Sequence, residues 1–334
     1  MTPSTETVSC NLCGNLTTTV CYADIARIDT PSTQVVECNQ CGLVYLNPRL
    51  ARLADNFTMD EAYLRKFYLP YYQDMGLLTP DLELDIVENH RFHRGALAEM
   101  QPYRESNRVL DVGCAIGLFL AAARADGWEC FGVEPSSHLG EYGRTHFGLS
   151  IFEGELGHAE LAPNSFDVIT LWDVTEHLLD PKSTYRLVYR LLRPGGLLML
   201  RMPNWQSLAR ELLGPGWEMF VTDHFYYFTP DTLRALLEQT GYVPKYVSAN
   251  GIVPSEVAAI QATLGADAAA EAMACAQSTA GIGRGSTLTA AAQKPRSHRD
   301  RLQKAGELLR QGDLATLAAE ARKYAQSLLV ARSL

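Results

Sequence analysis

Two pairs of cysteines near the start of the chain have the spacing of metal ligands. Cys10 and Cys13 form one C-x-x-C pair and Cys38 and Cys41 form a second, and a glycine follows each pair. Each pair places two thiolates on one side of a tight turn, and two such turns complete a closed tetrahedral site, the arrangement typical of structural zinc. In a reducing compartment this spacing indicates metal ligands rather than disulfides, and four free thiols are the alternative.

A glycine-containing loop further along the chain could hold a ligand against its backbone. Residues 109–117 read V-L-D-V-G-C-A-I-G, between an expected strand and an expected helix. Glycine allows close approach of the backbone, and a helix N-terminus offers unpaired N–H groups. At the end of the next expected strand, in G-V-E-P, the carboxylate of Glu134 can accept hydrogen bonds from both hydroxyls of a ribose. A surface acid at the start of the following helix is the alternative for Glu134.

Two histidines and two acids form a third candidate group. Asp173, Glu176 and His177 would share one face if their turn is helical, and His224 follows the next strand in T-D-H-F. Because the carboxyl ends of neighbouring parallel strands open into one cleft, we expect His177 and His224 to converge. Three roles remain open: a divalent metal site, a metal-free histidine base or positioning group, and purely structural histidines.

Alternating strands and helices would position these residues. From residue 108 onward short apolar stretches alternate with helical patterns, which predicts parallel β-α-β units. Strands are expected at 108–112, 129–134, 149–152, 166–172, 196–202 and 243–250, with helices near 117–126, 136–146, 181–192 and 230–239. A helical insertion and a seventh strand at 286–292, antiparallel to the sixth, should follow. Thr79 with Pro80 is expected to begin a helix before this domain.

Four ordered motifs resemble the class I S-adenosylmethionine-dependent methyltransferases. They are V-L-D-V-G-C-A-I-G, G-V-E-P, F-D-V-I-T-L-W-D-V-T-E-H-L-L-D-P and L-R-P-G-G-L-L-M-L, within residues 104–295. The resemblance implies a Rossmann-like α/β fold with a seven-stranded, mostly parallel sheet whose last strand is antiparallel. S-adenosylmethionine would be the cofactor, contacted by Asp111, Gly113, Cys114, Ala115, Gly117, Glu134, Pro135, Glu155, Leu156, Trp172 and Asp173.

Individual roles follow from the same resemblance. The glycine loop would contact the amino-acid end of the cofactor, Glu134 the ribose, the turn at 154–157 the adenine, and Trp172 and Asp173 the region of the methyl group. Ala115 stands where many members have a third glycine, so we expect slightly altered geometry. For Asp111 the alternative is bracing of the loop by hydrogen bonds.

The cysteine-containing module, the following L-V-Y-L-N-P-R and the tyrosine-rich segment resemble the N-terminal part of a methyltransferase subgroup that includes sugar C-methyltransferases and natural-product O-methyltransferases. In that subgroup the N-terminal part covers the acceptor site. The resemblance assigns substrate binding to Tyr63, Tyr68, Tyr71 and Tyr72, with ordinary packing as the alternative. The spacing of Asp173, Glu176, His177 and His224 is similar to metal-assisted 2′-O-methyltransferases of small RNAs and to ubiquinone-pathway O-methyltransferases. Asp173 stands where those proteins have glutamate, and the shorter side chain of aspartate reaches less far toward a metal.

Four parts are expected along the 334 residues: a zinc ribbon at 1–55, a tyrosine-rich helical lid or linker at 56–105, the catalytic domain at 106–295 with an insertion at 254–283, and a C-terminal helical hairpin at 296–334. The net charge of -9 argues against nucleic-acid partners, although the stretch from residue 294 is basic. The polar start and the lack of a long apolar run lead us to expect a cytoplasmic protein without membrane contact.

These observations favour O-methylation of a small molecule in secondary or sugar metabolism. The alternatives are C-methylation of a nucleotide-linked sugar, methylation of RNA, and cofactor binding without activity. The Asn or Asp, Pro, Pro, aromatic signature of nucleobase N-methylation is absent after the fourth strand, where Trp172-Asp173-Val174-Thr175 stands. Oxygen or an acidic carbon is therefore the expected acceptor atom.

Overall fold

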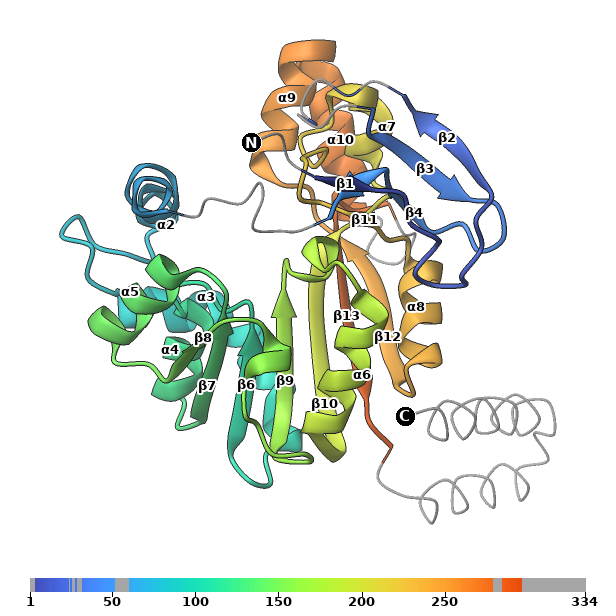
Figure 1. Cartoon of the computed structure of the whole chain (residues 1–334). Helices are drawn as coiled ribbons and strands as arrows, with labels where there is room; N and C mark the ends of the chain where they lie inside the picture. The colour runs from blue at the N-terminus through green and yellow to red at the C-terminus, as the bar shows by residue number, and fades with distance from the viewer. Residues whose placement is uncertain are drawn as a thin grey trace, which may run out of the picture.

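A seven-stranded sheet forms the centre of the catalytic domain (Figure 1). The computed structural model describes residues 4–23, 25, 28, 32–51, 60–278 and 284–295. Within them the strand order is β12-β13-β10-β9-β6-β7-β8. The strands are β6 (Arg108–Val112), β7 (Glu129–Glu134), β8 (Ile151–Glu153), β9 (Phe166–Trp172), β10 (Leu192–Pro203), β12 (Val243–Asn250) and β13 (Thr287–Gln293). β13 lies antiparallel to both β10 and β12, so the expected Rossmann-like methyltransferase fold is confirmed.

Helices cover both faces of this sheet because side chains alternate along each strand. Leu198, Leu200 and Met202 of β10 enter one core with α6 (Pro181–Leu191) and α8 (Pro230–Gln239). Leu197 and Met199 enter the other core with α3 (Ile86–Met100), α4 (Leu118–Ala125) and α5 (Ser137–Phe147). The carboxyl ends of the strands therefore lie between two layers of helices.

The helix starts are set by side-chain caps. The expected starts at Asp180-Pro181 and Thr229-Pro230 are confirmed, since Asp180 and Thr229 accept hydrogen bonds from the backbone of the first turn. The expected start at Thr79-Pro80 is wrong. The Thr79 hydroxyl accepts the Glu83 amide in a turn, and α3 begins later with Asp85 as its N-cap.

The cysteine-containing segment shares a sheet with the catalytic domain. The order is β11-β4-β3-β2 among the described residues, built from β2 (Thr18–Tyr22), β3 (Gln34–Cys38), β4 (Val44–Asn47) and β11 (Tyr226–Tyr227). β1 (Thr5–Glu6) and β5 (Arg49–Leu50) pair separately. β11 comes from the chain between β10 and α8, so the ribbon sheet is completed by the catalytic domain.

The remaining described elements are helical. The tyrosine-rich segment runs through α1 (Glu61–Tyr63), the π-helix η2 (Leu64–Tyr68) and α2 (Leu69–Asp74). The expected helical insertion contains α9 (Pro254–Leu264) and α10 (Ala266–Ser278), which pack on α7 (Leu208–Leu213). Short 3-10 turns are η3 (Gln101–Tyr103), η4 (Leu156–His158), η5 (Thr175–His177) and η6 (Gly214–Gly216). The hairpin expected at 296–334 lies outside the described residues.

The ribbon and the insertion helices lie at the end of the sheet where β9 and β10 finish (Figure 1). Across the described part of the chain, no helix combines the length and the apolar character needed to span a membrane.

Candidate active site

Glu134 ends β7 directly beside the glycine loop. Its Oε2 accepts a hydrogen bond from the backbone amide of Ala115 at 2.8 Å, and its Oε1 accepts one from the backbone amide of Ser136 at 2.8 Å. Burial raises the pKa of this carboxyl group, and the two amide hydrogen bonds oppose that rise. Each carboxylate oxygen can accept a second hydrogen bond, so Glu134 can hold the loop and still accept two ribose hydroxyls.

The loop itself adopts left-handed backbone conformations. Gly113 has φ +70° and Gly117 has φ +83°. A Cβ atom on Gly113 would lie 2.6 Å from Cγ2 of Val174, so glycine is required for space as well as for conformation. Ala115 also lies in the left-handed region at φ +50°, which explains why glycine suits this position better.

The N-terminus of α4 faces this loop without a side-chain cap. Gly117 is the N-cap residue and has no side chain that could accept a hydrogen bond from the first turn. The first N–H groups of the helix can therefore bind an anionic group such as the carboxylate of an amino acid. Cys114, within the same loop, is buried.

Other expected cofactor residues surround Glu134. The Gly154 amide donates to the Glu134 carbonyl oxygen at 2.9 Å, which places the turn with Glu155 and buried Leu156 beside the end of β7. Pro135 follows directly in the chain, ahead of α5.

Asp111 and Trp172 line the ends of β6 and β9. Asp111 is buried and accepts a hydrogen bond from the Thr170 hydroxyl at 2.6 Å, so it braces β6 against β9. Burial raises the pKa of Asp111 to about 7. Trp172 packs edge-on against Phe119 of α4, and its indole N–H is buried without a hydrogen-bond partner among the described residues.

Glu176, His177 and His224, called the trio below, converge beyond the ends of β9 and β10. One ligand atom from each lies within 4.8 Å of the others, and the two imidazole rings are 4.6 Å apart between centroids. The Phe225 amide donates to the Glu176 carbonyl at 2.7 Å and ties the two segments together. The expected convergence of the histidines is confirmed.

Backbone carbonyl groups orient both imidazoles. His177 Nδ1 lies 2.9 Å from the Asp223 carbonyl oxygen and 3.4 Å from its carboxylate, and His224 Nδ1 lies 2.9 Å from the Met219 carbonyl oxygen. A carbonyl at Nδ1 fixes the tautomer and presents Nε2, the usual arrangement of metal-binding histidines.

The trio is buried and electrostatically coupled. Burial raises the pKa of Glu176 to about 8, and its Oε2 has no hydrogen-bond partner among the described residues. Burial alone would lower the pKa of His177, but the hydrogen bond to Asp223 and the charge of Glu176 outweigh it and raise that pKa to about 9. Burial and the positive charge of His177 lower the pKa of His224 to about 3. His224 is therefore neutral at neutral pH.

Asp173 stands apart from the trio. The expected shared helical face does not form, because η5 begins only at Thr175 and Asp173 has φ +55°. Its carboxylate instead pairs with Arg201, whose Nε lies 2.9 Å from Oδ2 and 3.1 Å from Oδ1.

The four tyrosines divide into two pairs. Tyr72 donates a hydrogen bond to the Tyr68 hydroxyl at 3.2 Å. Burial raises the pKa of both phenols, and the negative charges of Glu134 and Asp173 contribute at Tyr68 and Tyr72 respectively. Tyr68 therefore lies within electrostatic reach of Glu134, and Tyr72 within reach of Asp173. Tyr63 and Tyr71 are 37% and 59% exposed, so they lie mainly at the surface.

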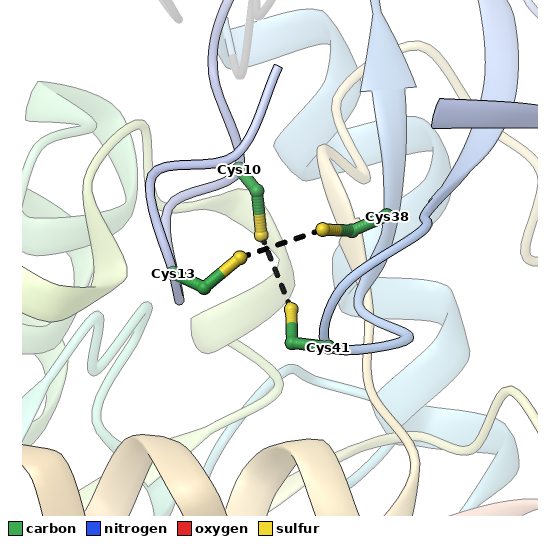
Figure 2. A group of neighbouring side chains, drawn as sticks. All are labelled: Cys10, Cys13, Cys38 and Cys41. Carbon is green, nitrogen blue, oxygen red and sulfur yellow. Dashed lines mark hydrogen bonds between the residues drawn. The ribbon is translucent and has the colours of Figure 1, made fainter. Parts of the chain in front are cut away.

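The four cysteines form one compact cluster (Figure 2). Cys10 Sγ lies 3.4 Å from Cys41 Sγ, and Cys13 Sγ lies 3.5 Å from Cys38 Sγ. A tetrahedral zinc ion with Zn–S bonds of about 2.3 Å would separate its sulfurs by about 3.8 Å. The cluster therefore fits a closed four-sulfur zinc site.

The sequence reasoning missed Asp223 and Arg201. Asp223 directly precedes His224 in T-D-H-F, and Arg201 is the one charged residue in the apolar run L-L-M-L-R-M-P. A lone charge at the end of a buried strand could have signalled Arg201. The contact of Asp223 with His177 joins segments 46 residues apart and has no local signature.

Comparisons with known proteins identify a methyltransferase domain. A family model described as a methyltransferase domain matches residues 88–246. A ubiquinone biosynthesis O-methyltransferase of Vibrio cholerae is 32% identical over 185 residues, which cover 51% of this chain and 76% of that protein. The ubiquinone biosynthesis O-methyltransferase of Ruegeria pomeroyi is 32% identical over 149 residues, which cover 41% of this chain and 60% of that protein. The chain thus spans less than two thirds of that relative.

The fold is shared with solved structures. A chain from the complex between the Haloferax volcanii Trm112 methyltransferase activator and its proposed methyltransferase superposes with a TM-score of 0.52 and 19% identity. The match covers 70% of this chain and 96% of the other.

Proposed function

The chain belongs to the class I S-adenosylmethionine-dependent methyltransferases, and we propose that it methylates a hydroxyl group of a small molecule. The trio carries this proposal, because O-methylation requires removal of a proton from the acceptor and the trio lies where the ends of neighbouring strands meet. The O-methyltransferase names of the relatives support the same acceptor atom. We place the acceptor in secondary or sugar metabolism.

The residues around Glu134 would hold the methyl donor. Glu134 would accept the ribose hydroxyls, the open N-terminus of α4 would receive the amino-acid carboxylate, and Leu156 would border the adenine. Tyr68 and Tyr72 would cover the donor. Alignment of the acceptor oxygen with the methyl group then supplies much of the rate.

We propose that the trio binds a divalent cation. Once binding has released the protons of His177 and Glu176, two imidazoles oriented through Nδ1 and a buried carboxylate with an oxygen that lacks a partner among the described residues form a suitable set of nitrogen and oxygen ligands. Such a cation, when bound, stabilises a deprotonated hydroxyl. Glu176 would offset its charge, while Asp223 would hold the ring of His177 in place. Asp173 is not part of this proposed ligand set.

A metal-free mechanism with His224 as the base is the second candidate. Its ring lies beside the ring of His177. The two imidazoles oriented through Nδ1 and the Glu176 oxygen that has no partner in the described part of the chain favour the cation over this mechanism.

Isotope transfer tests the function. Protein would be incubated with methyl-labelled S-adenosylmethionine and pools of phenols, sugars and nucleotide-linked sugars, and labelled products would be identified by mass spectrometry. A product methylated on oxygen supports the proposal. A methyl group on carbon would establish the sugar C-methyltransferase alternative instead, and label in added RNA would overturn the small-molecule assignment.

Chelation and mutation distinguish the two mechanisms. With a cation, chelator should abolish turnover, and Mg²⁺ or Mn²⁺, which a four-sulfur site disfavours, should restore it. Glu176→Gln should then be as damaging as His224→Ala. If His224 acts as the base, His224→Ala alone should lower turnover roughly 10²-fold to 10⁴-fold, and chelator should have no effect that Mg²⁺ reverses.

A further inference from the structure

Arg201 places a positive charge near the carboxyl end of β10. It is the register partner of Trp172 on β9, and it follows Leu197 and Met199 on the face of the sheet covered by α3 and α4. No step of the proposed methyl transfer uses this side chain, which is 40% exposed.

Asp173 occupies only part of the guanidinium group. A guanidinium can bind one carboxylate through Nε and Nη2 and a second through Nη1 and Nη2. The hydrogen bonds to Asp173 use Nε and Nη2, and none of the described residues bonds to Nη1. The Asp173 contact therefore fixes the orientation of Arg201 and leaves its second edge available.

The surroundings of Arg201 suit the body of an aromatic ligand. The charge of Arg201 contributes to the pKa shifts of Tyr72, His93 and Glu176, so all three lie within its electrostatic reach. His93, Phe119 and Trp172 form a row of edge-to-face ring contacts, with centroids 5.6 and 5.5 Å apart. A partly exposed cation beside aromatic rings can select a flat anion.

We propose that Arg201 binds a carboxylate of the acceptor, so that the enzyme acts on aromatic hydroxy acids. The inference rests on the proposed methylation of a small-molecule hydroxyl and narrows its substrate class. A carboxylate presents two coplanar oxygens to the second guanidinium edge, as Asp173 does to the first. Asp173 neutralises part of the charge and lies close to the incoming anion, so it sets the orientation while it limits the affinity.

Calorimetry with benzoate and benzamide tests this assignment. The two probes share size and shape but differ in charge, and neither needs to be methylated. Titrations would use the full chain saturated with S-adenosylhomocysteine. We expect benzoate to bind at least 10-fold more tightly than benzamide, because a charge-assisted pair of hydrogen bonds discriminates on this scale.

Two variants should change benzoate affinity in opposite directions. Arg201→Gln should weaken benzoate binding about 10-fold to 100-fold and leave benzamide unchanged. Asp173→Asn removes the competing charge and should strengthen benzoate binding several-fold. Circular-dichroism melting curves like that of the wild type would show that the fold of both variants is intact.

Arg284→Gln is the matched control. Arg284 pairs with Glu211, and the side-chain exposures of 39% and 55% resemble the 40% and 48% of Arg201 and Asp173. Equal binding of benzoate and benzamide, or equal losses in the Arg201 and Arg284 variants, would overturn the proposal. Since the probes carry no acceptor hydroxyl, this outcome is separate from failure of the O-methylation assay.

Discussion

At the level of single residues, Glu134 shows how one carboxylate can stabilise a loop and select a ligand. The Ala115 amide that it accepts lies in the glycine loop, and the Ser136 amide begins the next helix. Removal of the carboxylate should therefore disturb the loop and the ribose contact together.

Glu134→Ala should weaken the binding of S-adenosylhomocysteine by about 2 kcal/mol, roughly 30-fold, measured by calorimetry, because two charge-assisted hydrogen bonds are lost. Glu153→Gln is the control. Glu153 is the register partner of Glu134 on β8, but it is exposed and pairs with Arg144. Unchanged affinity in the Glu134 variant, or equal losses in both, would contradict the ribose assignment.

The sequence predicts some of these residues and not others. Glu134 follows from its place at a strand end after a glycine loop, and His177 and His224 from their places after neighbouring strands. Their supporting contacts could not be predicted. Helical spacing predicts that Asp173 shares a face with Glu176, but the left-handed backbone of Asp173 and its pair with Arg201 place its side chain elsewhere.

At the level of elements, apolar runs with clear polar or glycine boundaries predicted β6, β7, β9 and β12 to the residue. Two boundaries depended on competing local interactions. β10 begins earlier than expected because Leu192 pairs with Phe166 before a register shift. α3 begins later than expected because the Asp85 side chain accepts hydrogen bonds from two backbone amides of the first turn. The Thr79 side chain accepts only one, from the Glu83 amide.

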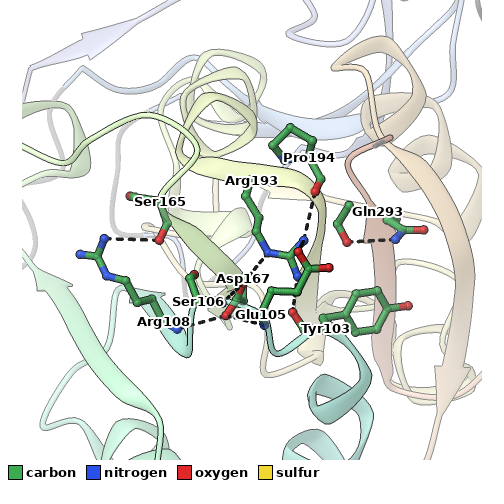
Figure 3. Close-up of polar contacts among 10 residues, drawn as sticks. Tyr103, Glu105, Ser106, Arg108, Ser165, Asp167, Arg193, Pro194 and Gln293 are labelled. Atoms are coloured by element: carbon green, nitrogen blue, oxygen red, sulfur yellow. Dashed lines mark hydrogen bonds and ion pairs between the residues drawn. The ribbon is translucent and has the colours of Figure 1, made fainter. Parts of the chain in front are cut away.

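A buried ion pair joins the amino-terminal ends of β9 and β10, at the opposite end of the strands from the trio (Figure 3). Asp167 of β9 is fully buried, pairs with Arg193 of β10, and accepts the amides of Glu105, Ser106 and Arg108 at 3.1 to 3.2 Å. Arg193 also donates to the Tyr103 carbonyl. One carboxylate therefore joins β9, β10 and the segment that enters β6.

Asp167→Asn should lower the free energy of unfolding by about 3 kcal/mol, measured by denaturant titration, because it leaves the buried Arg193 charge with only the half-exposed carboxylate of Glu105 as an ion-pair partner. Glu129→Gln is the control, since Glu129 is exposed and lies 3.6 Å from Arg108. A loss below 1 kcal/mol in the Asp167 variant would show that this network does not hold the strands.

The same carboxylate predicts an acid dependence. Burial would raise the pKa of Asp167, but Arg193 and the amide donors outweigh it and lower the pKa below 3.8. A lowered folded-state pKa stabilises the fold above the unfolded pKa, and this stabilisation is lost as pH falls through the folded value. The unfolding free energy of Asp167→Asn should therefore decline less below pH 4 than that of the wild type. Parallel declines would contradict this assignment.

At the level of the whole molecule, the ribbon and the trio share one structural unit. The sequence divides the chain near residue 55, and the zinc spacing gives no indication that β11 completes the ribbon sheet, because a two-residue strand has no detectable pattern. Tyr226 and Tyr227 pair with Tyr45 and Val44, and the Leu46 amide donates to the Phe225 carbonyl at 2.9 Å. These contacts begin one residue after His224.

Polar side chains strengthen the same junction. Arg49 is buried and donates to the Leu179 carbonyl at 2.7 Å and to the Tyr226 hydroxyl at 2.8 Å. Lys182 of α6 donates to the Leu12 carbonyl, within the first cysteine turn, at 3.0 Å. Loss of the cysteine cluster should therefore destabilise the segment that carries His224. The loop at Glu134 should stay in place, because other contacts hold it.

The purified protein should contain about one zinc ion per chain by metal analysis, and Cys38→Ser should lose it, since three cysteines no longer close the site. We expect turnover with the identified acceptor to fall at least 10-fold, because β11 and His224 lose their support. Binding of S-adenosylhomocysteine should stay within about twofold of wild type, since Glu134 and its amide donors lie on β7 and its neighbours.

Cys21→Ser, in β2 but outside the cluster, should retain zinc and turnover. Full turnover in zinc-free protein would separate the ribbon from the chemistry, whereas a parallel loss of cofactor binding would indicate that the whole domain, rather than the His224 segment, depends on the metal.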